Sequence, residues 1–187
     1  IVDNSRIVLK NVGLNPTRTG IVEVLRAMGA KLTIISQWQS GGETLGDLLI
    51  ESSQLKGTTI AGDIMPTLID EVPIIAVAAA YAQGITEIRN AEELKVKESN
   101  RLETIAIGLR QMGAKIDVLD DGLRIYGGGA LHGAHVDSFN DHRIAMSLAV
   151  AALAAEGETV IDHFEAVSVS WPDFVQDLAR LAGDADE

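Results

Sequence analysis

The chain has 187 residues and no cysteine, and its 15 basic side chains against 27 acidic ones give a formal net charge of −12. Its 47% apolar content excludes a disordered chain, the lack of cysteine excludes disulfides and thiolate metal sites, and the acidic balance argues against a nucleic-acid partner. No apolar run reaches the roughly 20 residues of a membrane span and no signal peptide opens the chain, so we expect a soluble, cytoplasmic protein without membrane partners.

The first predicted elements are a strand at residues 7–12 and a helix that follows it. The helix has one apolar face, because four apolar side chains recur at the spacing i, i+3, i+4 and i+7: Ile21, Val24, Leu25 and Met28. Gly29 follows at once and is typical of a helix C-terminus, and the alternating run 31–35 predicts the next strand. Because residue 1 is isoleucine and a strand comes so early, we expect the chain to begin inside a longer protein.

A second kind of helix is rich in alanine and apolar on nearly every side, so it is predicted to be buried. It begins at about Glu71 and again at about His142, and Gly84 and Gly157 are expected to end the two copies. One predicted strand follows each copy: residues 85–89 and 159–162.

Between the two buried helices, the pattern predicts a one-faced helix over residues 102–112, ended by Gly113. A hairpin follows it, with strands at 115–119 and 123–126 joined by an Asp-Asp-Gly turn. The last predicted helix covers residues 172–182.

Two stretches of the chain recur. Residues 25–32 return 84 residues later as 109–116, and residues 76–84 return 73 residues later as 149–157. Because the two repeats interleave, the repeated unit consists of a strand, a buried helix, a strand, a one-faced helix and a hairpin.

The middle unit is the complete one, from about residue 58 to residue 126. The first unit lacks its opening strand and buried helix, and the last stops after its second helix. No linker rich in proline or serine separates the units, so residues 1–187 are predicted to form a single α/β domain with incomplete ends.

Asp70 is the first candidate for chemistry. It comes just before a buried helix whose first turn contains Pro73. An aspartate there can simply cap the helix, because its carboxylate accepts hydrogen bonds from the free amides of the first turn. A helix cap and a catalytic carboxylate are both open interpretations.

Lys97, Glu98 and Arg101 form the second candidate group. Their spacing of three and four places them on adjoining faces if they belong to one helix. Two cations and a carboxylate at a helix N-terminus favour the binding of a phosphate or carboxylate ligand. The alternative is a solvated charged face without a ligand.

Asp141, His142 and Arg143 form the third group, in which Asp141 is predicted to cap the second buried helix. An arginine at the start of an apolar helix must reach water or an anion, whereas a lone histidine is more often held by a structural hydrogen bond. No spacing of histidines and carboxylates resembles a zinc site, and neither a phosphate-binding loop nor a nucleophile elbow is present.

All three groups are predicted to lie at the N-terminal end of a helix. If the units stack around a common axis, these ends converge on one face and collect two carboxylates and three cations: Asp70, Glu98, Lys97, Arg101 and Arg143. Carboxylates among cations suit general acid–base catalysis on a polyanionic substrate.

Two longer runs carry a resemblance to a known family. Residues 96–102 (Val-Lys-Glu-Ser-Asn-Arg-Leu) and 140–146 (Asn-Asp-His-Arg-Ile-Ala-Met) resemble the C-terminal signatures of the enolpyruvyl transferases, and residues 68–73 and 170–174 extend the match. The resemblance implies an enzyme of two lobes, each an inside-out α/β barrel of three repeated units, with the active site between them. This chain is similar to most of the C-terminal lobe, and the N-terminal lobe is expected as its missing partner.

Within that family the chain is most similar to the enzymes that use shikimate 3-phosphate. The resemblance implies transfer of the enolpyruvyl group of phosphoenolpyruvate to the 5-hydroxyl of shikimate 3-phosphate, with release of phosphate and with no metal or organic cofactor. It also implies a role for each candidate. Asp70 is expected to accept the proton of the 5-hydroxyl, and Glu98 to be a proton-transfer partner. Lys97 is expected to contact the shikimate phosphate and the reacting centre, and Arg101 and Arg143 to bind phosphoenolpyruvate beside His142.

Two positions depart from the family pattern: Glu93 stands where the family has asparagine, and Glu165 where some members have lysine. Two other functions stay open, namely the sister transferase that acts on UDP-N-acetylglucosamine and a non-catalytic repeat module that binds an anion or a protein. Alone, the chain is expected to fold, to expose an apolar edge that promotes self-association, and not to catalyse.

Overall fold

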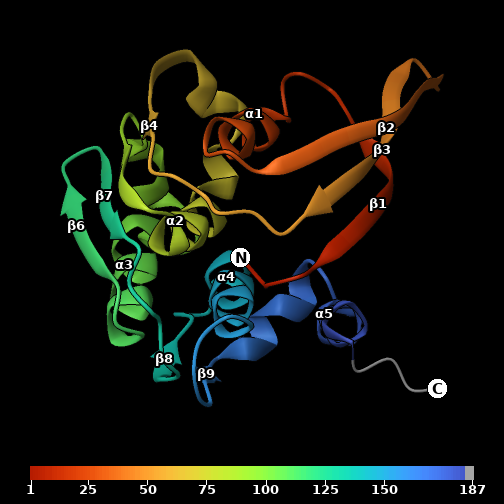
Figure 1. The fold of residues 1–187 in the computed structure, drawn as a ribbon. Helices are drawn as coiled ribbons and strands as arrows, with labels where there is room; N and C mark the ends of the chain where they lie inside the picture. Colours follow the sequence, from red (N-terminus) through yellow and green to blue (C-terminus); the bar gives the residue numbers. More distant parts are fainter. Residues whose placement is uncertain (184–187) are drawn as a thin grey trace.

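Figure 1 shows the computed structural model of the protein, which describes residues 1–183. The first unit contains one helix and a three-stranded antiparallel sheet in the order β1-β3-β2. Its elements are β1 (Arg6–Gly13), α1 (Gly20–Ala27), β2 (Lys31–Ser40) and β3 (Glu43–Glu51). β2 continues beyond its predicted end and pairs with β3, a strand that the sequence analysis did not identify.

The second unit is the complete one. A short strand, β4, pairs in parallel with β5, and the hairpin of β6 and β7 adds antiparallel, which gives the sheet order β4-β5-β7-β6. The elements are β4 (Thr59–Ile60), α2 (Val72–Tyr81), β5 (Gly84–Ile88), α3 (Arg101–Gln111), β6 (Lys115–Leu119) and β7 (Gly122–Gly127). The predicted unit of strand, buried helix, strand, helix and hairpin is confirmed.

The third unit repeats the opening of the second, because its two strands are again parallel neighbours with a helix between them in the chain. Its elements are β8 (His135–Asp137), α4 (His142–Ala152), β9 (Val160–Asp162) and α5 (Phe174–Ala182). Short 3₁₀ helices, which periodicity did not predict, connect several of these elements: η1 (Gly62–Thr67), η2 (Ile69–Glu71), η3 (Glu92–Val96) and η4 (Phe164–Val169).

The alanine-rich helices end earlier than predicted. α2 ends at Tyr81 and α4 ends at Ala152. Gly84 is instead the first residue of β5, and both it and Gly157 adopt the left-handed backbone (φ 93°) that favours glycine. The glycines predicted to end α1 and α3 do follow those helices closely, with positive φ values.

α2 and α4 contact each other in the middle of the molecule (Figure 1). α2 also packs against α3 and β7, and most of its side chains are buried, as its apolar sequence predicts. α4 is less enclosed, since Arg143 and Val150 are only half-buried, so the predicted burial is confirmed for one face of this helix and not for nearly every side. No helix within residues 1–183 is long and apolar enough to cross a membrane.

Close backbone contacts join the strands on either side of each alanine-rich helix. Gly57, before β4, donates its amide to the carbonyl of Gln83 over 2.8 Å, and Gly133, before β8, donates to the carbonyl of Glu156 over 2.7 Å. A Cβ atom added at Gly57 would lie 2.2 Å from the carbonyl oxygen of Ile85, and the shortest such distance at Gly133 is 2.0 Å. The repeat therefore includes a glycine that the sequence analysis did not single out.

Replacing Gly57 by alanine is expected to lower the free energy of unfolding by about 1–3 kcal/mol, because the new methyl group overlaps backbone atoms. Gly129→Ala is the matched control, since a Cβ atom there has open space and the backbone has no positive φ. Urea unfolding of both variants measures the difference. Equal losses in the two variants, or no loss in Gly57→Ala, would contradict the close contact.

Candidate active site

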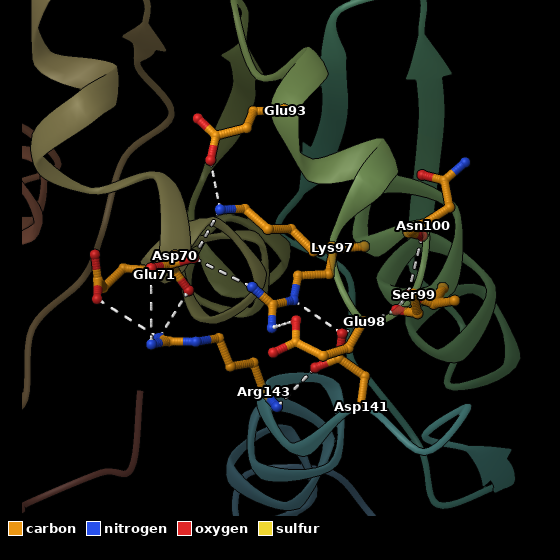
Figure 2. A network of polar contacts seen from close by, with 11 residues as sticks. Asp70, Glu71, Glu93, Lys97, Glu98, Ser99, Asn100, Asp141 and Arg143 are labelled. Carbon is orange, nitrogen blue, oxygen red and sulfur yellow. Dashed lines mark hydrogen bonds and ion pairs between the residues drawn. The ribbon is translucent and has the colours of Figure 1, made fainter. Parts of the chain in front are cut away.

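The N-terminal ends of three helices meet in one polar network (Figure 2). Asp70 belongs to η2, directly before α2; Arg101 is the first residue of α3; and Arg143 lies in the first turn of α4. Arg101 Nη1 lies 3.2 Å from Asp70 Oδ1, and Arg143 Nη2 lies 3.9 Å from Asp70 Oδ2. The predicted convergence of these three residues is confirmed.

The Arg101 side chain is only 2% exposed and lies at the centre of the network. Its Nε donates to Asp141 Oδ2 over 2.8 Å, its Nη1 donates to Asp70, and its Nη2 donates to Glu98. A buried guanidinium is costly unless carboxylates neutralise it and accept its hydrogen bonds. Arg101 thus links Asp70 and Glu98, the two candidate proton-transfer groups, to a buried aspartate.

Asp141 is fully buried and makes two kinds of contact. One carboxylate oxygen accepts from the backbone amide of Arg143 over 2.9 Å, which confirms the predicted cap of α4. The other accepts from Arg101 and from the Ser99 hydroxyl, 3.0 Å away. Burial opposes ionisation of Asp141, but these hydrogen bonds and the charge of Arg101 outweigh it and lower the pKa of the carboxyl below its usual value.

Asp70 does not cap α2. The N-cap residue of α2 is Glu71, and its side chain makes no cap hydrogen bond. The Asp70 carboxylate faces cations from outside α2 instead, with Lys97 Nζ 3.8 Å from its Oδ1 in addition to the two arginines. The interpretation of Asp70 as a cap alone is therefore wrong.

Lys97 and Glu98 do not share a helix with Arg101, so the condition under which their spacing places them on adjoining helix faces is not met. α3 begins only at Arg101, because the side chain of Asn100 caps it, and the two residues occupy the segment between η3 and α3. Both still join the network, since Lys97 Nζ donates to Glu93 and the half-exposed Glu98 accepts from Arg101. The hydrogen bond to Glu93 is the largest cause of a raised pKa of the Lys97 ammonium.

Arg143 extends from α4 to the segment before α2. Its Nη1 donates to the backbone oxygen of Asp70 over 3.1 Å and lies 3.7 Å from Glu71 Oε1. Its side chain is 30% exposed, so an anion can reach it. His142 begins α4 and is half-buried, but within residues 1–183 its ring makes no hydrogen bond or ion pair, so the predicted structural hydrogen bond is not found there.

The network contains three cations and five carboxylates: Lys97, Arg101 and Arg143, with Asp70, Glu71, Glu93, Glu98 and Asp141. Each cation is therefore paired with carboxylates of the protein itself. Among the described residues, no cluster of three histidine or acidic side chains is arranged to hold a metal ion. The exposed part of the network can bind anions and exchange protons.

Comparison with known proteins decides the family. A sequence model described as EPSP synthase (3-phosphoshikimate 1-carboxyvinyltransferase) matches residues 1–178. The chain belongs to the EPSP synthase family. Curated 3-phosphoshikimate 1-carboxyvinyltransferases from Thermosynechococcus vestitus and Gloeothece citriformis are 53% and 56% identical to it over 182 and 181 residues. These matches cover 97% of this chain but 41% and 40% of the relatives, so the chain spans about two fifths of their length.

Solved structures agree with this assignment to the EPSP synthase family. An EPSP synthase from Acinetobacter baumannii superposes with a TM-score of 0.92 at 41% identity, over 97% of this chain and 42% of that one. The enolpyruvyl transferase NikO from Streptomyces tendae superposes with a TM-score of 0.74 at 23% identity, which shows a shared fold alone. The predicted inside-out α/β lobe of the enolpyruvyl transferase type is confirmed.

The positions that depart from the EPSP synthase pattern differ in their relation to the network. Glu93 lies in η3 and contacts Lys97, so it belongs to the network. Glu165 lies in η4, and within the described part of the chain it makes no ion pair with the network. Ser99 was not among the sequence candidates, and Asp141 was expected only as a cap and not as a partner of Arg101, although both lie inside the two signature runs that carried the resemblance.

Proposed function

We propose that the chain forms the C-terminal part of the active site in an enzyme that moves the enolpyruvyl group of phosphoenolpyruvate onto the 5-hydroxyl of shikimate 3-phosphate and releases phosphate. This step belongs to the shikimate pathway, which leads to the aromatic amino acids. The observation that carries the proposal is the single network in which Asp70 faces Lys97, Arg101 and Arg143, in a chain of this family.

The reaction needs proton transfer at two atoms. The methylene carbon of phosphoenolpyruvate gains a proton while the attacking 5-hydroxyl loses one, which gives a tetrahedral intermediate; loss of phosphate and of one methyl proton then restores the double bond. Asp70 is the proposed acceptor of the hydroxyl proton, and the half-exposed Glu98 exchanges the proton at carbon. In this scheme no metal or organic cofactor takes part.

The substrates carry several negative charges, and the partly exposed cations are the proposed contacts for them. Lys97, 25% exposed, contacts the shikimate phosphate and the reacting centre, and Arg143 with its neighbour His142 contacts phosphoenolpyruvate. Arg101 is buried and its Nη2 is covered by Glu98, so it reaches phosphoenolpyruvate only when Glu98 moves aside. Otherwise it positions the two proton-transfer groups.

The proposed partner that completes the site is the N-terminal lobe, because the curated relatives are more than twice as long as the part that this chain matches. Carboxylates outnumber cations in the network, so further cations have to come from the facing lobe to bind two anionic substrates. Neither a nucleic acid nor a membrane is a proposed partner. We propose the cytoplasm as the compartment, in keeping with the acidic, cysteine-free composition.

The chain alone is expected to release no phosphate from phosphoenolpyruvate and shikimate 3-phosphate, because water enters an open site and its charges then act in a high dielectric. With the N-terminal part of the enzyme added, turnover is expected. A phosphate-release assay measures both, with UDP-N-acetylglucosamine as the alternative acceptor. Turnover by the chain alone would contradict the two-lobe mechanism. A preference for the UDP-sugar would support the sister transferase, and a complex without turnover would support a non-catalytic module.

An apolar surface of the first unit is proposed to be covered in the complete enzyme. β1 takes the place in the first unit that β5 and β9 take in the other two. β5 and β9 each have a parallel neighbour, whereas within residues 1–183 β1 has none, and Val8 and Leu9 on this strand are exposed. A cavity of about 180 Å³ also opens between β3, α1, α2 and α4 and is lined mainly by apolar side chains. Light scattering is expected to show oligomers of the chain alone and a one-to-one complex with the N-terminal part. A monomer at every concentration would rule out this self-association.

A further inference from the structure

An anion that binds a cation of this network has to compete with a protein carboxylate, and the carboxylates differ in how easily they can be displaced. Asp141 is fully buried and caps α4, and Asp70 has three cations within 4 Å. Glu98 covers Arg101, but Arg101 keeps Asp141 and Asp70 as partners when Glu98 leaves. Loss of any of these three contacts therefore sets free little positive charge for a ligand.

Glu93 is different from these three carboxylates and from Glu71, which is only 26% exposed and lies 3.7 Å from Arg143, a cation that is also near Asp70. The Glu93 side chain is 63% exposed, and within residues 1–183 its carboxylate pairs with Lys97 alone. Lys97 has one other carboxylate within 4 Å, Asp70 Oδ1, at the longer distance of 3.8 Å. Release of Glu93 therefore exposes an ammonium group directly beside the proposed proton acceptor.

The structure also gives Glu93 a place to move. A hollow of about 250 Å³ lies beside η3, and it is lined by Gly62, Met65, Pro66, Ile69, Asn90, Glu92 and Glu93 itself. Figure 2 shows Glu93 at the outer end of the network, joined to it through the Lys97 ammonium. A change of side-chain rotamer is enough to carry the Glu93 carboxylate away from this ammonium.

We propose that Glu93 is a specificity-determining residue of the anion site: its carboxylate pairs with Lys97 in the empty site and competes with the anionic group of the ligand that binds there. The inference rests on the proposed function, because it takes Lys97 as a substrate contact. A strongly charged phosphate ester displaces Glu93, whereas a weaker anion such as chloride or a single carboxylate does not. Glu93 thus selects for the phosphorylated substrate.

Glu93→Gln keeps the shape of the side chain and removes its charge. The variant is expected to bind inorganic phosphate about two- to fivefold more tightly than the wild type, the effect of removing one exposed competing charge. Glu92→Gln is the matched control, because it changes the net charge equally in the same 3₁₀ helix and Glu92 makes no ion pair among the described residues. NMR titration of the chain with phosphate at fixed ionic strength, followed at the amides of Lys97 and Asp70, measures the affinity.

A second pair of variants, with Lys97→Met in both, separates competition at the Lys97 ammonium from other effects. When Lys97 is already methionine, the additional change Glu93→Gln is expected to leave the phosphate affinity unchanged. In the chain with Lys97 intact, the pKa of its ammonium is expected to fall in Glu93→Gln and to stay constant in Glu92→Gln, because the hydrogen bond to Glu93 is the main cause of the raised value. This second readout needs no ligand and reports the ion pair directly.

Weaker phosphate binding by Glu93→Gln would overturn the proposal and make Glu93 a residue that holds Lys97 in place for the ligand. Equal tightening in both glutamine variants would overturn it too, because the effect would then come from net charge. If neither the wild type nor Glu93→Gln binds phosphate, the competition is overturned. The proposed function is still decided separately, by phosphate release from the completed enzyme.

Discussion

Replacing Asp141 by alanine is expected to lower the free energy of unfolding by about 3–5 kcal/mol. The buried guanidinium of Arg101 then loses Asp141, a fully buried carboxylate that pairs with it. Loss of the α4 cap adds to the effect. Asp121→Ala is the matched control: Asp121 Oδ1 accepts from Arg89 Nε over 2.7 Å, nearly the distance of the buried pair, but the Arg89 side chain is 43% exposed, against 2% for Arg101. Its removal is expected to cost much less. Similar losses in urea unfolding would show that burial of the network is not what makes Asp141 important.

The stability contributed by Asp141 also depends on pH in a defined direction. Its pKa is lower in the folded protein than in the unfolded chain, so the contribution is complete above about pH 4 and is lost as the pH falls through the lower folded value. The wild type is therefore expected to lose stability below about pH 4. Asp141→Asn is expected to be less stable at neutral pH and to show a shallower loss in acid. If the free energy of unfolding of this variant fell below pH 4 as steeply as that of the wild type, the pH dependence would belong to other carboxylates.

Asp70→Asn is expected to lower the turnover of the completed enzyme by about 10²–10⁴-fold, with a smaller change in KM, because an amide cannot accept the proton of the 5-hydroxyl. The amide oxygen can still accept the hydrogen bond from Arg101, so the fold is expected to persist. Asp63→Asn is the control, since Asp63 is an exposed aspartate of η1 and makes no ion pair within residues 1–183. A decrease below about tenfold for Asp70→Asn would assign this residue a role in binding rather than in proton transfer.

The helices and the hairpin of the middle unit could be predicted because their apolar side chains repeat with the period of the element that buries them. α1, α3 and the β6–β7 pair follow their patterns closely. The segment 97–100 could not be placed in the same way, because four polar residues carry no apolar period. The spacing of Lys97, Glu98 and Arg101 left open whether they share a helix, and the cap at Asn100 makes Arg101 the first residue of α3.

The meeting of three helix ends could also be predicted, because repeated units bring equivalent ends together. Which residues of the site are buried could not be predicted from the sequence. Arginine is usually exposed, so nothing in the sequence indicated that Arg101 lies under the surface or that Asp141 is its partner as well as a cap. Both facts depend on contacts between α3 and α4, whose first residues are about 40 positions apart in the chain.

We propose that Asp70 and the cations around it form the part of the active site that this chain contributes. A crystal structure of the chain combined with the N-terminal lobe, with shikimate 3-phosphate bound, tests it most directly. The 5-hydroxyl is expected within hydrogen-bond distance of Asp70, with Lys97 on the ligand instead of on Glu93. A ligand bound away from Asp70, with the Lys97–Glu93 pair intact, would contradict this assignment of Asp70 and Lys97.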